Sequence, residues 1–242
     1  MLYPELSEQK GKLFLRPFNY QCYKEEGRKV IHQRIGDIVL VLCIQEEIEK
    51  GFHIMRDISK KSSKANNREE RQLLDIALQN SLMRMPPRLY VAEDVRFSYE
   101  RQEGEFMSEE GVWEHKWHPE DLAEGRKGYR LTTTYQENGA LAIFYPGVQE
   151  RLAQIMGGDY YVGFVSIHEA VIHPASHKNL YEMQAAILRN SAFQTKQDIL
   201  TNQIYRYSCS QKKLLQIQIN AKCSEIVPAM DSSVCIMLKD VD

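Results

Sequence analysis

The sequence predicts an α+β fold in which antiparallel β-hairpins pack against three or four amphipathic helices. Three observations support this prediction. Short runs rich in Thr, Tyr and β-branched residues are bounded by turn residues, as is typical of antiparallel strands. Apolar residues recur at helical spacing in several other segments. The chain has 242 residues, which is enough to bury a sizeable core.

The first predicted elements are two paired strands. The apolar run at residues 38–44 is expected to form a buried strand. It is followed by the polar stretch QEEIEK, and the strand is expected to pair across this turn with residues 51–55.

A helix is predicted to follow these strands. Asn67 and Glu70 have the spacing of a capping box, and the Pro86-Pro87 pair stops the pattern. Between them, apolar or small side chains recur at i, i+3, i+4, i+7, i+8 and i+11, as one face of a helix requires. These residues are Leu74, Ala77, Leu78, Ser81, Leu82 and Met85.

Residues 129–190 are predicted to form a β-β-α-β-β-α unit. Residues 129–135 and 140–145 are expected to form a hairpin across Asn138-Gly139, since both residue types accept the positive φ of a tight turn. The next helix is bounded by the Gly-containing pairs Pro146-Gly147 and Gly157-Gly158. Two strands and a second amphipathic helix should follow. Their expected ranges are 159–165, 167–172 and 177–190.

The composition suggests three parts. We expect an N-terminal α+β half at residues 1–95, an acidic insertion with both tryptophans at 96–128, and a C-terminal half with its tail at 129–242. No internal repeat and no Pro- or Ser-rich linker forces a split, so a single domain is the alternative.

One stretch resembles a known family. The run NGALAIFYPGVQERLAQIMGGDYYVGFVSIHEAVIHP is similar to the signature of domain-of-unknown-function family 5688, with its Asn-Gly, Tyr-Pro-Gly-Val, Gly-Gly-Asp and Ser-Ile-His-Glu succession. The segments LLDIALQNSLMRMPP and NQIYRY resemble further parts of that family. The chain looks like a short or N-terminally truncated member, and it is more distantly similar to family 1444. The resemblance implies a fold and a bacterial setting, but no reaction.

The charge balance does not favour nucleic acid. The chain has 31 basic and 33 acidic residues, which gives no electrostatic footprint for a polyanion. Basic residues cluster at Lys60, Lys61 and Lys64 and continue to Arg68 and Arg71. A solvated loop that leads into a helix is the favoured interpretation of this cluster, and local nucleic-acid binding is the alternative.

The sequence predicts a cytoplasmic protein. The first residues contain no apolar h-region, and the longest apolar run, at residues 38–44, is too short to cross a bilayer. The five cysteines contain no Cys-x-x-Cys pair, which fits reduced thiols. They are Cys22, Cys43, Cys209, Cys223 and Cys235.

Both tryptophans lie in the acidic insertion, within VWEHKWHPED. If this stretch is extended, Trp113, His115 and Trp117 point to the same side. Two exposed tryptophans are typical of a partner-binding hot spot. The structural alternative is that they fasten the insertion to the rest of the protein.

Clustered histidines invite a metal-site interpretation, but their spacing does not support it. On a strand, His168 and Glu169 face opposite ways, and so do His168 and His173. On a helix, Glu169, His173 and His177 would share a face, but Pro174 disfavours a helix there. We therefore predict no bound metal and no cofactor.

A hydrolase is the enzymatic alternative. Ser166 lies two residues before His168, so a strand would place both side chains on one face, with Glu169 as the next residue. No Gly-x-Ser-x-Gly elbow surrounds the serine, and no acid partner is specified.

The sequence thus favours a non-catalytic binding or interaction protein of the cytoplasm of a bacterium or one of its mobile elements. Its favoured partner is another protein. The alternatives are a hydrolase that uses Ser166, His168 and Glu169, and local nucleic-acid binding through Lys60, Lys61 and Lys64.

Overall fold

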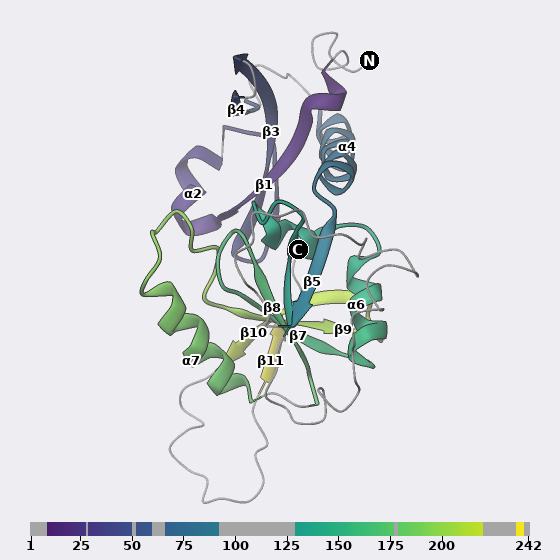
Figure 1. Ribbon diagram of the computed structural model, residues 1–242, viewed down its shortest axis with the longest axis vertical. Helices are drawn as coiled ribbons and strands as arrows, with labels where there is room; N and C mark the ends of the chain where they lie inside the picture. Colours follow the sequence, from purple (N-terminus) through teal and green to yellow (C-terminus); the bar gives the residue numbers. More distant parts are fainter. Residues whose placement is uncertain are drawn as a thin grey trace, which may run out of the picture.

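The α+β class is confirmed by a computed structural model, which describes residues 9–27, 29–49, 52–59, 66–91, 129–176, 179–219 and 236–239. These residues form two antiparallel sheets and four α-helices. Figure 1 shows the smaller sheet with α2 (Tyr20–Gly27) and α4 (Asn67–Arg84) at one end of the molecule. The larger sheet lies at the other end, with α6 (Val148–Met156) and α7 (Leu180–Ser191).

The smaller sheet is built around β3 (Ile38–Glu49), the apolar run that the sequence predicts as a strand. β1 (Leu13–Asn19) pairs with one edge of β3, and β2 (His32–Ile35) and β4 (Phe52–Asp57) pair with the other. The predicted partner strand is present as β4, but the predicted turn at QEEIEK is wrong, because β3 continues through this stretch to Glu49. Residues 52–55 therefore pair with 45–49, whereas Cys43 and Ile44 pair with Asp57 and Arg56.

The α4 helix is the element that the sequence predicts most completely. Its capping box is formed by Asn66 and Glu69, one residue earlier than the predicted Asn67 and Glu70. Because both pairs have the same spacing, the sequence pattern does not distinguish them. Ser81 accepts the backbone N–H of Leu15 on β1 over 3.1 Å, so the helix covers part of the free edge of that strand. The 3-10 helix η1 (Lys10–Lys12) precedes this strand.

The larger sheet has seven strands in the order β11-β10-β9-β7-β8-β6-β5. Alternate residues of its central strands face opposite layers. Tyr161, Ile204 and Ile217 pack under α7, whereas Tyr160 and Tyr205 face the main core. The strands are β5 (Pro87–Val91), β6 (Tyr129–Thr133), β7 (Tyr160–Phe164), β8 (Ala170–Pro174), β9 (Ile204–Ser208), β10 (Lys213–Ile219) and β11 (Ile236–Lys239).

Two predicted strands differ from the structure. The expected strand at 140–145 is instead the 3-10 helix η2 (Gly139–Phe144), so residues 129–145 do not form a hairpin. The pattern of a short, buried apolar run is compatible with both a strand and a helix. In this segment the tertiary contacts determine that a 3-10 helix forms. The expected strand at 167–172 begins only at Ala170, because residues 166–169 form the turn between β7 and β8. The second predicted helix is confirmed as α7, with a start at Leu180.

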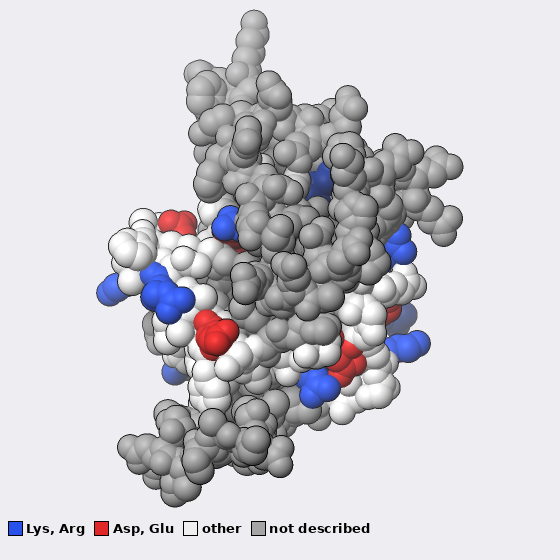
Figure 2. Space-filling view, turned by 60° about the horizontal axis from the view of Figure 1, so that its bottom comes forward, with Lys and Arg blue, Asp and Glu red and all other residues white. Residues whose placement is uncertain are grey.

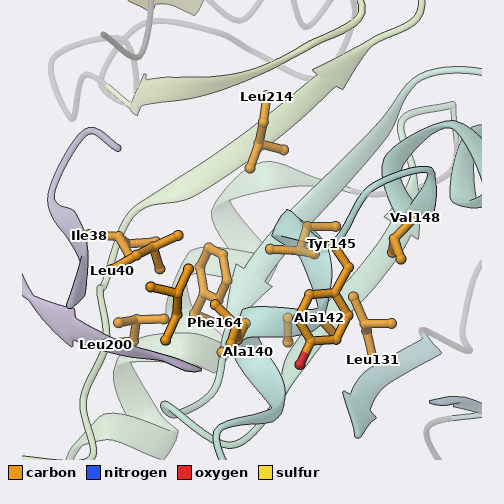
Figure 3. Packing of buried hydrophobic residues seen from close by; sticks show 14 of the residues in the cluster. Ile38, Leu40, Leu131, Ala140, Ala142, Tyr145, Val148, Phe164, Leu200 and Leu214 are labelled. Carbon is orange, nitrogen blue, oxygen red and sulfur yellow. The ribbon is translucent and has the colours of Figure 1, made fainter. Parts of the chain in front are cut away.

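One hydrophobic cluster spans both sheets. In Figure 3, Ile38 and Leu40 of β3 lie beside Phe164 of β7 and Leu200, which belong to the larger sheet and its flanking loop. In addition, β5 lies in the predicted N-terminal half but pairs with β6 of the larger sheet. Within the described residues, no helix is both long and apolar enough to span a membrane.

The turn between β2 and β3 fastens the smaller sheet to the larger one. Gly36 has a φ of +61°, and its neighbour Asp37 does not have a positive φ, which fits a two-residue type II′ turn. The carboxylate of Asp37 accepts hydrogen bonds from the hydroxyl groups of Thr201 and Tyr205. Nearby, the side-chain amide of Asn19 donates to the carbonyl of Leu200 over 2.8 Å.

Candidate functional site

The Ser-Ile-His-Glu segment forms a tight turn between β7 and β8. The backbone N–H groups of Val165 and Ser166 both donate to the carbonyl of Glu169, over 3.1 and 3.3 Å. The Ser166 hydroxyl oxygen accepts the backbone N–H of His168 over 3.0 Å. Since Ser166 is only 7% exposed, its side chain is part of the turn itself.

His168 joins this turn to the segment before η2. Its Nδ1 accepts the backbone N–H of Asn138 over 3.2 Å. A neutral imidazole that accepts at Nδ1 carries its proton on Nε2. That Nε2 lies 4.0 Å from the Asp198 carboxylate, and the His168 side chain is 43% exposed. Neither ring nitrogen therefore offers a free lone pair in this arrangement.

Gly139 packs directly against the same turn. A Cβ atom at this position would lie 2.1 Å from both the His168 carbonyl oxygen and Thr132 Oγ1. Thr132 Oγ1 also donates to that carbonyl over 2.8 Å. The glycine is thus required by close packing, and the positive φ of 48° belongs to Asn138.

Glu169 forms an ion pair with a cation on the neighbouring strand β6. Arg130 on β6 donates from one guanidinium nitrogen to both carboxylate oxygens of Glu169, over 3.0 and 3.3 Å. Both side chains are partly buried, at 29% and 21% exposure. The pair holds the turn against β6, next to the contact between Thr132 and His168.

This geometry gives the Ser-Ile-His-Glu residues structural contacts and does not arrange them as a nucleophile with its base. A serine nucleophile needs a basic nitrogen within hydrogen-bond reach of its hydroxyl. Here Ser166 contacts the backbone of His168, and the Nδ1 atom of that histidine faces Asn138. Sequence reasoning missed the contact between His168 and Asn138 because these residues lie thirty positions apart in the chain.

A polar hollow of about 640 Å³ lies between β2 and the N-terminal half of α4, and we call it the β2–α4 hollow. Its lining residues are His32, Gln33, Arg34, Asn67, Glu70, Arg71, Leu74 and Asp75. Leu74 supplies its most buried surface, with 8% exposure. The sequence pattern did not reveal this site, because its walls come from two segments that are brought together only by folding.

Several polar groups of the hollow are held in place. Nδ1 of His32 lies 3.0 Å from the carbonyl of Val30, so Nδ1 carries the proton and Nε2 is left as an acceptor. Arg34 donates from Nε to the carbonyl of Gly36 over 2.8 Å, and its guanidinium lies 3.7 Å from the centre of the Tyr20 ring. In the part of the chain that the structure describes, Arg71 and Asp75 have neither an ion pair nor a hydrogen bond to a side chain.

Comparison with protein families identifies the chain. The profile of DUF5688, a family of unknown function, matches residues 3–209. The chain belongs to DUF5688. No curated protein and no solved structure matches it. The more distant resemblance to family 1444 receives no support from the family comparison.

In this DUF5688 member, the remaining predicted sites are only partly described. His173 lies on β8 opposite Tyr161, and His177 lies outside the described residues. No group of three or more His, Cys, Asp or Glu side chains within the described ranges is arranged to hold a metal ion.

The two other predicted binding sites of this DUF5688 member also fall outside the described residues. They are the basic residues Lys60, Lys61 and Lys64, and the residues Trp113, His115 and Trp117 of the acidic insertion. Where the structure does describe the surface, Figure 2 shows basic and acidic side chains interspersed on the face in view.

Proposed function

We propose that this DUF5688 protein is a non-catalytic binding protein and that the β2–α4 hollow is its binding surface. The observation that carries the proposal is the pair of exposed, oppositely charged side chains Arg71 and Asp75, which line the hollow without partners in the described residues. They lie four positions apart on α4, a spacing at which an ion pair can form, but no ion pair joins them in the described residues. Both charges are therefore available to a ligand.

The contacts of the Ser-Ile-His-Glu turn support the non-catalytic part of the proposal. Ser166, His168 and Glu169 each make a contact that holds the turn in place. A hydrolase would need at least one of them to be free for proton transfer. The polar contacts around this turn are accounted for by its docking on Asn138 and Arg130.

The proposal places the protein in the bacterial cytoplasm. Cys22, Cys43 and Cys209 are free thiols, and two of them are exposed. Free, exposed thiols are compatible with a reducing compartment. A protein partner is favoured over nucleic acid, because the hollow presents carboxylates as well as guanidinium groups.

Affinity capture with a charge-reversed hollow tests the proposal. The variant Arg71→Glu with Asp75→Lys keeps the net charge and should lose at least one partner that the wild type captures from a lysate of its host. The matched control reverses two exposed charges on α7, Glu182→Lys with Arg189→Glu, and should capture the same partners as the wild type. Equal capture by all three proteins would refute the hollow as the binding surface.

A second measurement tests the non-catalytic part. The wild type is screened against ester, peptide and phosphoester substrates. The proposal expects no hydrolysis that requires Ser166, His168 or Glu169. Turnover that is lost in a folded Ser166→Ala variant would establish the hydrolase alternative instead.

A further inference from the structure

The edge of β2 beside the hollow has backbone groups without a hydrogen-bond partner among the residues that the structure describes. Among the described strands, β2 pairs only with β3. The two-residue turn makes Ile35 and Ile38 a hydrogen-bonded pair, and Leu42 donates to the carbonyl of Ile31 over 2.9 Å. Ile31, Gln33 and Ile35 therefore turn their backbone groups toward the β3 side of β2, where the N–H of Ile31 donates to the carbonyl of Ile58 over 2.9 Å.

The intervening residues, His32 and Arg34, must turn their N–H and C=O groups away from β3. Both residues also line the β2–α4 hollow. The hollow therefore runs along a strand edge, and its other wall is the charged face of α4.

The spacing of the charges on α4 matches the repeat of a strand. Arg71 and Asp75 are separated by four residues, which is about 6 Å along a helix. Alternate residues of an extended chain lie about 6.6 Å apart on the same side. An extended peptide in the hollow can thus set one side chain against Arg71 and the side chain two positions away against Asp75.

We infer that the hollow takes an extended peptide segment of a partner protein, added to β2 as a further strand, with an acidic and a basic residue two positions apart. The main-chain groups of His32 and Arg34 would hold the peptide backbone, and Arg71 and Asp75 would select its side chains. The inference rests on the proposed binding function of the hollow. Because the edge offers only two outward-facing residues, the added strand is short.

Proline and alanine at one position test the strand addition. Arg34→Pro removes an outward N–H that makes no bond to β3, and edge strands tolerate such a proline. Arg34→Ala keeps this N–H and removes the guanidinium, so it is the matched control. Peptides are selected on the wild type from a random-peptide library. We expect the selected peptides to carry an acidic and a basic residue two positions apart. Their affinity for Arg34→Pro should be at least about fivefold lower than for Arg34→Ala, because one main-chain hydrogen bond is lost.

Amide hydrogen exchange gives a readout that does not depend on a variant. Strand addition predicts that bound peptide slows exchange at the amides of His32 and Arg34 in the wild type. Equal binding by the two Arg34 variants, together with unchanged exchange at both amides, would overturn strand addition. If the Arg71→Glu with Asp75→Lys variant still lost its partners, the proposed function would stand while this inference failed.

Discussion

The backbone N–H of Asn138 donates to Nδ1 of His168 over 3.2 Å, and this bond joins two segments that both lie within the range matched by the DUF5688 profile. The Asn-Gly pair and the Ser-Ile-His-Glu segment lie about thirty residues apart, yet they form one packed unit. Gly139 lies against the carbonyl of His168, and Ala140 donates to the carbonyl of Ile167 over 3.2 Å. Asn138, Gly139 and His168 therefore all take part in the same contact between the two segments.

Gly139→Ala should destabilise the protein by about 1–3 kcal/mol, because the new methyl group overlaps backbone and side-chain atoms that are themselves tightly packed. The Cβ would lie 2.8 Å from the Cα of Thr132, in addition to its closer contacts. Urea unfolding measures the change. Gly11→Ala is the control, because a Cβ there meets nothing within 4 Å, and it should leave the unfolding midpoint nearly unchanged.

His168→Ala should lower the free energy of unfolding by about 1–3 kcal/mol, because it leaves the N–H of Asn138 buried without an acceptor. Asn138 is only 5% exposed, so water cannot readily replace the lost partner. His168→Asn places an amide oxygen close to the former Nδ1 and should recover part of the loss. Chemical denaturation of the two variants compares them, and equal losses would contradict an accepting role for Nδ1.

Tyr145→Phe should leave the protein equally stable or stabilise it by up to about 1 kcal/mol, since an unpaired buried hydroxyl is unfavourable. Tyr145 is 2% exposed, and its hydroxyl has no hydrogen-bond partner among the described residues. Tyr205→Phe is the contrasting change, because the Tyr205 hydroxyl donates to Asp37. It should destabilise by about 1–3 kcal/mol in the same thermal melting experiment, as expected for a hydrogen bond to a charged group.

Acid should weaken the wild type more than the variant Asp159→Asn. Burial by itself would raise the pKa of the Asp159 carboxyl. The backbone amide of Cys209 and the guanidinium of Arg206 have the larger opposite effect, so the pKa lies below its ordinary value. Arg206 lies 2.7 Å from the carboxylate. A depressed pKa contributes stability above the unfolded-state value of about 3.9, and this contribution is lost as the pH falls through the folded-state pKa.

The stability difference between wild type and Asp159→Asn should therefore be largest near neutral pH and shrink below about pH 4. Denaturant titrations at a series of pH values measure this difference. A difference that stays constant from neutral to acidic pH would show that the ionised carboxylate contributes nothing.

Local signals in the sequence were sufficient for several elements. The apolar run of β3 is buried as its pattern predicts, with Leu40 only 1% exposed. On α4, the predicted residues Leu74, Ala77 and Ser81 are buried, together with Leu73, which the pattern did not select. In α4 the hydrophobic period and the end signals agree with each other. In β3 the apolar run predicts the strand but not its end, which lies at Glu49. The end of α6 also follows from its own residues, because Gly157 adopts the left-handed conformation that caps the helix.

Tertiary contacts decided the elements whose local signals were ambiguous. Asn138-Gly139 has the composition of a hairpin turn, but the close approach of His168 and Thr132 to Gly139 leads the chain into η2. The β2–α4 hollow likewise depends on how α4 crosses the smaller sheet.

The sequence by itself determined the α+β class, the family, and the elements in which one strong local pattern is repeated over several turns or residues. Only the tertiary structure revealed the contacts of His168 and Glu169, because a polar side chain can be assigned a role only when its partner is known. Those partners, Asn138 and Arg130, come from other segments of the chain. Hydrogen bonds act over about 3 Å in space, whatever the separation along the sequence.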